Sequence, residues 1–438
     1  MHRAPQLSTL AVLALLGTAC SADIEPTPLA SGPIPEWTGQ PVSISLSAYD
    51  EDRFTAIVER FDQENTGIEV ELVLADYGAH HDSILATDTA APDSPTMVLV
   101  EEGFRVRILA QSERFTDLNR FGAAELESLY PAWMWEAAVD ADGAVRGIGL
   151  DVSGLAMCYR ADLFEAAGLP YERDDVEAAI GDTWDGFIEL GNGYRNSTGT
   201  RGFVDNATNV YHPRIVQLGN GNLGVTDNGE LDGDTIREAI KPPFEMLIRG
   251  LSAYSKAWSP EWKAGFSNRD FAVVLCPLWM LGYIEDQVDE HTGTPTWRVA
   301  DIPGPGGNWG SNHLTISADA TLEEQAAAWV FITWLLEPTQ QEWLTEELGM
   351  LSAQIDVLTG PATAKLTHEF FGDEPVGPIF AASVLDVPAP FYVHPCTNDV
   401  RNEVELNFNG AQEGQASIVD LPDLIEERAE EALSQCLG

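Results

Sequence analysis

Residues 42–74, VSISLSAYDEDRFTAIVERFDQENTGIEVELVL, decide the fold of this chain. Apolar and polar residues alternate over 42–47, which is the pattern of a β-strand with one buried face. Apolar residues then recur at helical spacing over 52–64, and Asn-Thr-Gly at 65–67 ends that helix. Residues 68–74 read as a second strand. A strand, a helix and a strand in this order indicate an α/β sheet.

Further segments of the same kinds follow along the chain. The largely apolar run at 96–100 predicts a strand buried on both faces. Other predicted strands cover residues 145–150, 155–159, 271–275 and 297–302. Helical spacing continues over 322–346, where Pro338 interrupts one helix and starts the next, and an acidic helix covers 421–437.

The composition excludes two classes of partner. The 438 residues include 23 Lys and Arg against 70 Asp and Glu, a net charge of −47, while 44% of the residues are hydrophobic. That apolar fraction can build a core, and the length corresponds to two or three domains. A chain with this net charge repels the phosphate backbones of nucleic acids, which excludes nucleic acid as a partner. It also lacks a cluster of basic residues that could bind anionic lipids, which excludes polybasic membrane binding. The acidity is typical of a surface hydrated for high salt, or of a composition bias that keeps the protein soluble.

The N-terminus resembles an export signal. A charged start precedes the apolar run at 10–16, which is too short to span a bilayer permanently, and small residues then end in Cys20. This pattern resembles a bacterial lipobox, which implies that residues 1–20 are a lipoprotein signal peptide and that Cys20 is lipidated. Gly17 departs from the lipobox, which usually has Leu, Val or Ile there, and ordinary secretion is the alternative. Residues 21–40 are rich in proline and small polar residues, so we expect a flexible tether.

Four cysteines remain after Cys20, and an even number in an exported chain favours disulfides. Cys396 and Cys436 lie near the C-terminus, where a bridge would fasten the last helix. Cys158 and Cys276 lie in apolar, strand-like runs and are either bridged or buried as thiols. The spacings fit neither a zinc ribbon nor a C-x-x-C redox pair.

Several short motifs do not carry the chemistry that they suggest. Residues 219–224 match G-x-G-x-x-G, but turn-forming residues follow in place of the helix that a dinucleotide site needs. The His-His-Asp run at 80–82 has no further histidine at ligand spacing, which disfavours a metal site. The Glu pair at 101–102 lies on a strand, where neighbours point to opposite faces and do not form a hydrolase acid–base pair. We therefore expect no cofactor, no metal and no catalysis.

Several segments, in a fixed order, resemble one family. They are TGIEV at 66–70, FTDL at 115–118, DGAVRGIG at 142–149, MCYRADLF at 157–164, GLP at 168–170, TWDGF at 183–187 and PLW at 277–279. Together they resemble the extracellular solute-binding proteins of ABC transporters, in the maltose-binding-protein-like group (family 1), over about residues 42–355. The sequence departs from the family at 149–150, where a proline is usual, and at Arg160, where asparagine is usual. GGNWGS at 306–311 also resembles actinobacterial proteins for cellobiose- or chitobiose-type oligosaccharides.

The resemblance implies an α/β, two-lobed periplasmic-binding-protein-like fold with a ligand cleft between the lobes. The hinge would consist of three crossing segments, at 147–151, 301–307 and about 349–358. The N-terminal lobe would hold residues 41–148 and 304–355, and the C-terminal lobe would hold residues 149–303 and 356–438. A ligand would close the lobes about the hinge, and the closed form would dock on a membrane permease.

We expect the cleft to collect aromatic and polar side chains that follow the strands. Aromatic rings cover the flat faces of a sugar, while carboxylates and amides bind its hydroxyl rim. The candidate ligand-binding residues are Tyr49, Asp50, Asp76, Tyr77, Glu101, Glu102, Asp151, Trp279, Asn308 and Trp309. The alternatives are solvated carboxylates at strand ends and a core position for Trp279. Trp184 is expected to pack, and Trp133 and Trp135 fit either the core or the cleft wall.

The function that the resemblance implies is binding without covalent chemistry. The protein would be the extracellular, lipid-anchored component of an ABC importer, a monomer on the outer face of the cell membrane. It would deliver an oligosaccharide to the permease, and a neutral one because the carboxylates disfavour anions. One alternative is a binding protein for a cationic polyamine or peptide, with aromatic rings around its ammonium groups. The other is a secreted carbohydrate-active enzyme with two carboxylates across the cleft.

Overall fold

The computed structural model describes residues 33–86, 94–109, 111–140, 142–199, 202–218, 224–226, 228–288, 296–388 and 394–438. The predicted signal peptide, Cys20, residues 21–32 of the predicted tether and most of the motif at 219–224 lie outside these ranges. Among the helices in these ranges, none combines the length and the apolar character needed to cross a membrane.

The opening β-α-β unit forms as the sequence predicts. β1 (Val42–Ala48), α1 (Glu51–Glu64) and β2 (Ile68–Leu74) follow one another, and β1 pairs with β2 in parallel with Val42 opposite Ile68. The apolar residues of α1 lie along one face of the helix, and that face is buried.

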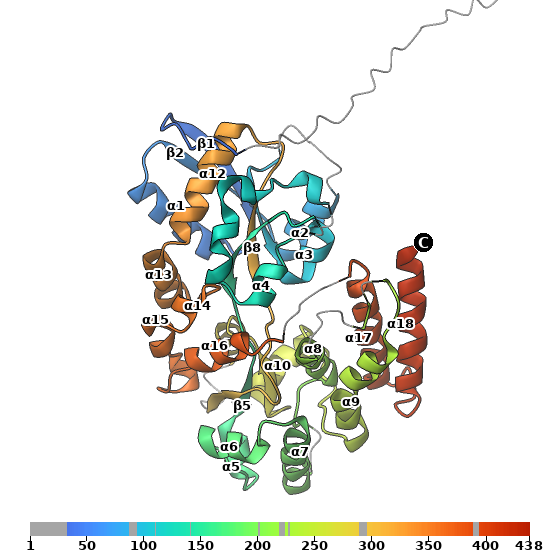
Figure 1. Ribbon diagram of the computed structural model, residues 1–438. Helices are drawn as coiled ribbons and strands as arrows, with labels where there is room; N and C mark the ends of the chain where they lie inside the picture. The colour runs from blue at the N-terminus through green and yellow to red at the C-terminus, as the bar shows by residue number, and fades with distance from the viewer. Residues whose placement is uncertain are drawn as a thin grey trace, which may run out of the picture. The chain divides into compact units, whose positions relative to one another are not determined.

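A six-stranded sheet grows from this unit, in the order β2-β1-β3-β8-β4-β9. Its strands β1, β2 and β8 are labelled in Figure 1. The added strands are β3 (Met97–Glu101), β4 (Ile148–Val152), β8 (Asn312–Ile316) and β9 (Leu351–Ser352). β3 is parallel to β1, whereas β8 runs antiparallel between β3 and β4. Strands that are far apart in the sequence therefore meet in one sheet.

A separate three-stranded antiparallel sheet has the order β6-β5-β7. β5 (Ala156–Arg160) lies between β6 (Val273–Cys276) and β7 (Trp297–Asp301), which cover the predicted strands with small shifts at their ends. A disulfide joins Cys158 of β5 to Cys276 of β6, so the pair that the sequence left open is bridged.

Helices surround both sheets, and their bounds follow in chain order. They are α2 (Tyr77–Ala86), α3 (Glu102–Leu109), α4 (Ala132–Glu136), α5 (Ala161–Ala166), α6 (Arg173–Ile180), α7 (Trp184–Thr198), α8 (Ala207–Gln217), α9 (Gly233–Arg249), α10 (Pro260–Asn268), α11 (Met280–Gln287), α12 (Leu322–Leu335), α13 (Pro338–Leu348), α14 (Ile355–Leu358), α15 (Pro361–Lys365), α16 (Gly377–Leu385), α17 (Thr397–Gln412) and α18 (Leu421–Leu437). Short 3₁₀ helices cover Ser112–Arg114, Leu118–Phe121, Ala123–Leu129 and Glu369–Phe371. The division of 322–346 at Pro338 is confirmed, because the first turn of a helix tolerates the missing N–H of proline.

The chain passes from the first sheet to the second just after β4. We predict a crossing at 147–151, but β4 pairs there with β8 and β9, so most of that segment stays in the six-stranded sheet. The passage is made by residues 153–155 instead. The return from β7 to β8 runs through residues 302–311 and includes most of the predicted crossing at 301–307. Residues 349–358 contain β9 and α14.

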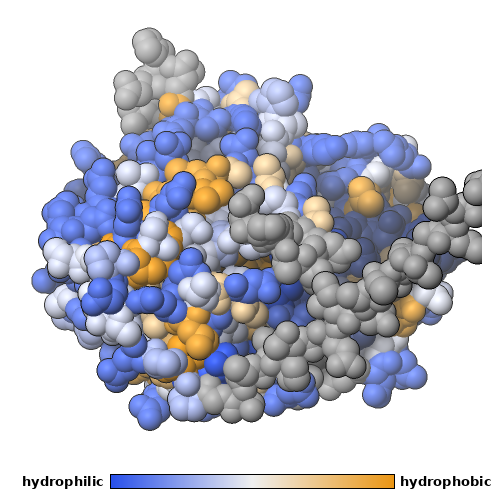
Figure 2. Space-filling model, turned by 90° about the horizontal axis from the view of Figure 1, so that it is seen from above, coloured by the Kyte–Doolittle hydropathy of each residue, from blue (hydrophilic) through white to orange (hydrophobic). Residues whose placement is uncertain are grey.

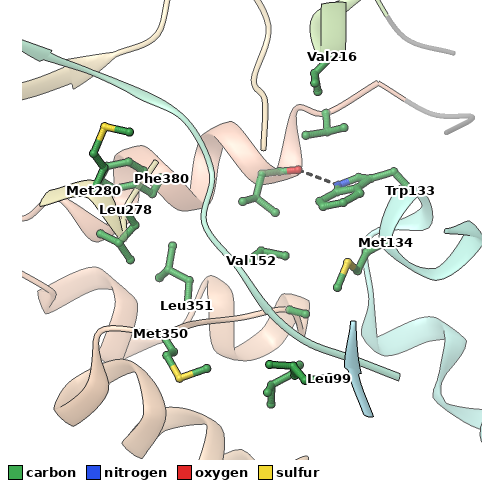
Figure 3. Packing of buried hydrophobic residues seen from close by; sticks show 14 of the residues in the cluster. Leu99, Trp133, Met134, Val152, Val216, Leu278, Met280, Met350, Leu351 and Phe380 are labelled. Atoms are coloured by element: carbon green, nitrogen blue, oxygen red, sulfur yellow. Dashed lines mark hydrogen bonds between the residues drawn. The ribbon is translucent and has the colours of Figure 1, made fainter. Parts of the chain in front are cut away.

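Both tryptophans of α4 belong to the hydrophobic core. Trp133 is 2% exposed, and its indole N–H donates to the carbonyl of Val384 at 3.0 Å (Figure 3). Trp135 is buried in the same cluster of apolar residues. Trp184 packs in a second cluster, as predicted, and its indole N–H donates to Gln217.

The last part of the predicted tether packs on the domain. Ile34 is 7% exposed and its N–H donates to the carbonyl of Arg120 at 3.2 Å. Thr38 donates to Glu323 at 3.0 Å, and the ring of Trp37 lies against Gly67. Residues 33–40 are therefore part of the folded domain, because Ile34 is buried and Trp37 and Thr38 contact residues of the domain.

Two helices close the C-terminal end of the chain. α17 and α18 pack against each other, and a disulfide joins Cys396, directly before α17, to Cys436 near the end of α18 (Figure 1). The bridge fastens the last helix.

The surface matches the acidic composition. Hydrophilic residues cover most of the described part of the face in Figure 2, with smaller apolar patches between them. The ion pairs at the surface include Arg237 with Glu426 and Arg428 with Glu431. With 23 basic residues against 70 acidic ones, most carboxylates have no basic partner to pair with, and water solvates those at the surface.

Candidate ligand-binding site

A cavity of about 650 Å³ is lined by residues of the six-stranded sheet and by segments that lie outside both sheets. It is lined by Tyr49, Asp50, Arg53, Phe54, Tyr77, Glu101, Asp151, Ser153, Trp258, Trp279, Trp309, Gly310, Asn312 and Met350. Polar groups come mainly from the six-stranded sheet and the segments after its strands, while the three tryptophans come from segments near the other sheet. The cavity therefore has a polar wall and an aromatic wall.

The polar wall begins at the turn between β1 and α1. Asp50 has a φ of 65°, and its carboxylate accepts from the N–H of Arg53 as the N-cap of α1. The Arg53 guanidinium forms an ion pair with Asp50 at 2.9 Å and donates to the carbonyl of Leu348 at 3.2 Å. The turn thus presents a carboxylate and a fixed cation to the cavity.

A chain of hydrogen bonds connects three strands in the same wall. The Tyr49 hydroxyl donates to the side-chain oxygen of Asn312. The Asn312 side-chain amide and its backbone N–H both donate to one Asp151 oxygen, at 2.8 and 3.1 Å. Burial raises the pKa of Asp151 to about 6, against the opposing effect of these donors.

Glu101, at the end of β3, is held by two neutral donors. The Tyr77 hydroxyl donates to its Oε2 at 2.8 Å, and the N–H of Gly103 donates to the same atom at 2.7 Å. Burial, followed by the nearby negative charge of Glu102, raises the pKa of Glu101 to about 7. Its carboxyl group can therefore either accept or donate a hydrogen bond near neutral pH.

The aromatic wall consists of Trp258, Trp279 and Trp309. The rings of Trp258 and Trp279 lie 6.1 Å apart and nearly parallel, and Trp309 meets Trp279 edge-on at 6.0 Å. The indole N–H of Trp279 donates to the carbonyl of Trp309 at 3.1 Å. Trp258 is 47% exposed and has a φ of 69°, so an unfavourable backbone conformation holds this large ring at the cavity.

Gly310 lets the Trp309 segment approach Trp279. Its φ is 96°, and a Cβ at this position would lie 3.0 Å from Nε1 of Trp279. Only glycine fits both this backbone conformation and this spacing. The Gly-rich sequence around Trp309 therefore has a steric cause.

Seven of the ten predicted ligand-binding residues line the cavity. They are Tyr49, Asp50, Tyr77, Glu101, Asp151, Trp279 and Trp309. Asp76 is exposed outside it. Glu102 and Asn308 also lie outside the cavity lining. The Asn308 side-chain amide donates to the Glu102 carboxylate at 2.5 Å, and the Asn308 side-chain oxygen accepts from the N–H groups of Ser153 and Gly154. These two residues brace the crossing segments.

The other seven lining residues were not predicted. They are Arg53, Phe54, Ser153, Trp258, Gly310, Asn312 and Met350. Arg53 and Phe54 lie on α1, one turn beyond the predicted Tyr49 and Asp50, so the N-terminus of that helix was a usable signal. Trp258 follows no strand and gave no comparable signal.

The two histidines at 80–81 have structural roles. His80 contacts Ser47 and the carbonyl of Leu99, and His81 contacts the carbonyl of Tyr77 and accepts from the N–H of Glu101. Burial lowers the pKa of His81 to about 4, so it is neutral at pH 7. Over the described ranges, no group of three or more His, Cys, Asp and Glu side chains is arranged to hold a metal ion.

The comparisons with known proteins agree on one family. A family model described as bacterial extracellular solute-binding protein matches residues 56–370. The lactose-binding protein of Rhizobium radiobacter is 24% identical over 280 residues, which cover 62% of this chain and 64% of that protein. The match therefore spans less than two thirds of the length of this relative.

Solved structures share the fold over nearly the whole chain. An extracellular solute-binding protein of family 1 is 25% identical, with a TM-score of 0.80, covering 90% of this chain and 100% of the other. A cyclic α-maltosyl-1,6-maltose binding protein from Arthrobacter globiformis is 21% identical, with a TM-score of 0.69 and the same coverage.

Proposed function

The chain belongs to the bacterial extracellular solute-binding proteins, and from this premise we propose that it binds an oligosaccharide in the cavity lined by Trp258, Trp279 and Trp309. In this proposal it delivers the sugar to the membrane permease of an ABC importer and acts without covalent chemistry. It is anchored by a lipid on Cys20 outside the cytoplasm and works as a monomer.

The observation that carries the proposal is the pairing of an aromatic wall with a polar wall. Trp258, Trp279 and Trp309 offer faces and edges on which the C–H surfaces of a sugar ring can stack. Asn312 and Asp151 line the same cavity and offer amide and carboxylate groups that suit hydroxyls. The cavity of about 650 Å³ is within the size range of small-ligand pockets.

The charge of the cavity favours a ligand without negative groups. Asp50, Glu101 and Asp151 face it, with Arg53 as the basic residue among its lining side chains. Phosphate, sulfate or carboxylate groups on a sugar would meet carboxylates in a buried setting, which is unfavourable. The lactose-binding relative and the maltosyl-maltose-binding structure are named for uncharged sugars, which supports the same choice.

A cationic ligand is the second candidate, and one observation favours it. The donors to Glu101 and Asp151 are neutral: a hydroxyl and a backbone N–H for the first, and an asparagine for the second. An ammonium group among the tryptophans would give these carboxylates a positively charged hydrogen-bond donor, in addition to the nearby charges of Arg401 and Arg53.

The lobe division remains part of the proposal. The N-terminal lobe would hold residues 41–152 and 304–355, and the C-terminal lobe residues 153–303 and 356–438; the first boundary moves from 148 to 152 because β4 pairs within the six-stranded sheet. A sugar that contacts residues of both lobes would favour the closed arrangement, because only there does it reach both.

A ligand screen tests the function. Cellobiose, chitobiose, maltose, xylobiose, lactose and spermidine are each added to the full chain, and the melting temperature and the binding isotherm are measured. A disaccharide that raises the melting temperature and is recovered intact supports the proposal. A shift with spermidine alone supports the cationic alternative, and released monosaccharide identifies an enzyme.

A pair of tryptophan variants ties the binding to this cavity. Trp258→Ala is expected to weaken disaccharide binding about 30-fold, since losing an aromatic anchor costs about 2 kcal/mol. Trp343→Ala removes a tryptophan of α13 outside the cavity and serves as the control. If both variants bind the disaccharide with equal affinity, Trp258 does not contribute to the binding site.

A further inference from the structure

α17 is fixed to the part of the molecule that carries the three-stranded sheet. Near its end, Gln412 accepts from the N–H of Ala207 at 3.1 Å and from the Ser252 hydroxyl at 2.8 Å. The Gln412 amide donates to Asn206 at 2.8 Å, and α17 also packs on α8 and α18. The disulfide between Cys396 and Cys436 fixes its other end. The helix is therefore anchored at both ends.

The first turn of α17 reaches the other sheet. The side-chain amide of Asn398 donates to the carbonyl of Gly103 at 2.6 Å. Gly103 lies in the first turn of α3, which begins directly after β3 of the six-stranded sheet. This hydrogen bond joins the parts of the chain that carry the two sheets, at a point outside the cavity lining.

The same glycine holds a cavity residue. The N–H of Gly103 donates to the carboxylate of Glu101 at 2.7 Å, and Glu101 lines the cavity. Gly103 thus takes part in two hydrogen bonds: its carbonyl accepts from Asn398, and its N–H donates to Glu101. A movement of α17 would be passed to the orientation of the Glu101 side chain through one residue.

A positively charged side chain in the next turn of α17 also attracts the two carboxylates where β3 ends and α3 begins. Arg401 lies near Glu101 and Glu102 and favours their charged forms, while its guanidinium also donates to Glu405 at 2.8 Å. Separating α17 from α3 would move this positive charge away from both carboxylates, which opposes separation.

We propose that the first turn of α17 is a latch: Asn398 positions the Glu101–Gly103 turn and so stabilises the cavity without lining it. The inference rests on the proposed function, because it assigns a positioning residue to that cavity. Its distinctive consequence is that ligand affinity depends on a helix outside the cavity lining.

The test compares Asn398→Asp and Asn398→Ala with Asn402→Asp and Asn402→Ala. Asn402 is exposed on the same helix, so its variants carry the same chemical change and charge. Asn398→Asp replaces a donor with an acceptor against the Gly103 carbonyl, and it adds a negative charge near Glu101. Asn398→Ala removes the donor alone and is the milder variant should the charge disturb folding.

Two measurements on the full chain give the result. Hydrogen–deuterium exchange of peptides covering residues 101–108 is expected to accelerate in the Asn398 variants and to stay unchanged in the Asn402 variants. The affinities for cellobiose, chitobiose, maltose, xylobiose and lactose are measured in parallel. Any disaccharide that binds wild type is expected to bind Asn398→Ala about 3- to 10-fold more weakly, as for one lost hydrogen bond.

The outcomes separate the latch from the proposed function. Unchanged exchange at 101–108 in both Asn398 variants overturns the latch, whether or not a sugar binds. Faster exchange with unchanged sugar affinity also overturns it, because the contact would then not support the cavity. If no disaccharide binds wild type while the exchange changes as expected, the contact between α17 and α3 stands and the sugar-binding function fails.

Discussion

Replacing Gly310 with alanine should damage the aromatic wall by a predictable amount. The φ of Gly310 is 96°, a region where a side chain costs about 1–2 kcal/mol. The new Cβ would also lie 3.0 Å from Nε1 and 3.4 Å from Cδ1 of Trp279, so the indole must shift by a few tenths of an ångström. That shift disturbs the hydrogen bond from Trp279 to Trp309, a further loss of about 0.5–1.5 kcal/mol.

A second glycine separates the two costs. Gly122 has a φ of 91°, close to that of Gly310, but a Cβ there would meet no atom within 4 Å. Gly122→Ala should therefore lower the free energy of unfolding by about 1–2 kcal/mol, the backbone cost alone. Gly310→Ala should lower it by about 1.5–3.5 kcal/mol, because both costs apply.

Urea unfolding and disaccharide titration measure both effects. Gly310→Ala should weaken binding of whichever disaccharide of the panel binds wild type, since two rings of the wall move. Gly122→Ala should bind that disaccharide like wild type, since Gly122 does not line the cavity. If the two variants lose equal stability and bind equally well, the close packing of Gly310 on Trp279 does not shape the site, and the steric explanation is refuted.

Three further predictions concern burial, charge and crosslinks. The pKa of Glu101 is raised to about 7 in the fold, so the folded state binds more protons than the unfolded chain between about pH 4.5 and 7. The free energy of unfolding should therefore fall as the pH rises through this range, and the melting temperature of Glu101→Gln should vary less with pH than that of wild type. Replacing both Cys396 and Cys436 with serine should lower the free energy of unfolding by about 4 kcal/mol, because the bridge closes a loop with a sequence separation of 40. Urea unfolding of this variant and of wild type measures the difference. Arg160→Ala should cost about 3–5 kcal/mol in the same assay, because the buried guanidinium forms a bidentate ion pair with Asp162; a loss under 1 kcal/mol would show that the pair is screened.

Much of the fold could be predicted from local patterns of apolar and polar residues. The alternation at 42–47 and the helical spacing at 52–64 describe elements that pack on one face, so their periodicity is visible without the rest of the chain. The crossing at 147–151 was misplaced because pairing with β8 and β9 holds those residues in the sheet. Those partners are distant in sequence, and no local pattern records them.

The site was predictable where it follows strands. Tyr49, Glu101 and Asp151 were found because residues at strand ends gather at one edge of a sheet. The same reasoning predicts Asn308, which does not line the cavity: its side-chain oxygen accepts from the N–H groups of Ser153 and Gly154, and its side-chain amide donates to Glu102. Trp258 was missed because a left-handed backbone conformation in a loop places it, and such a conformation is not apparent from residue type for tryptophan.

The position of β8 has a consequence for how the chain folds. β8 lies between β3 and β4, yet its residues 312–316 follow the entire three-stranded sheet in the sequence. Until that stretch arrives, β3 and β4 each have an unpaired edge, and the central part of the larger sheet cannot form. Contacts of such long sequence separation slow folding, since the loop entropy is lost before the strand pairs. The larger sheet can therefore be completed only after residues 312–316 are available, although β1, β2 and β3 can pair before then.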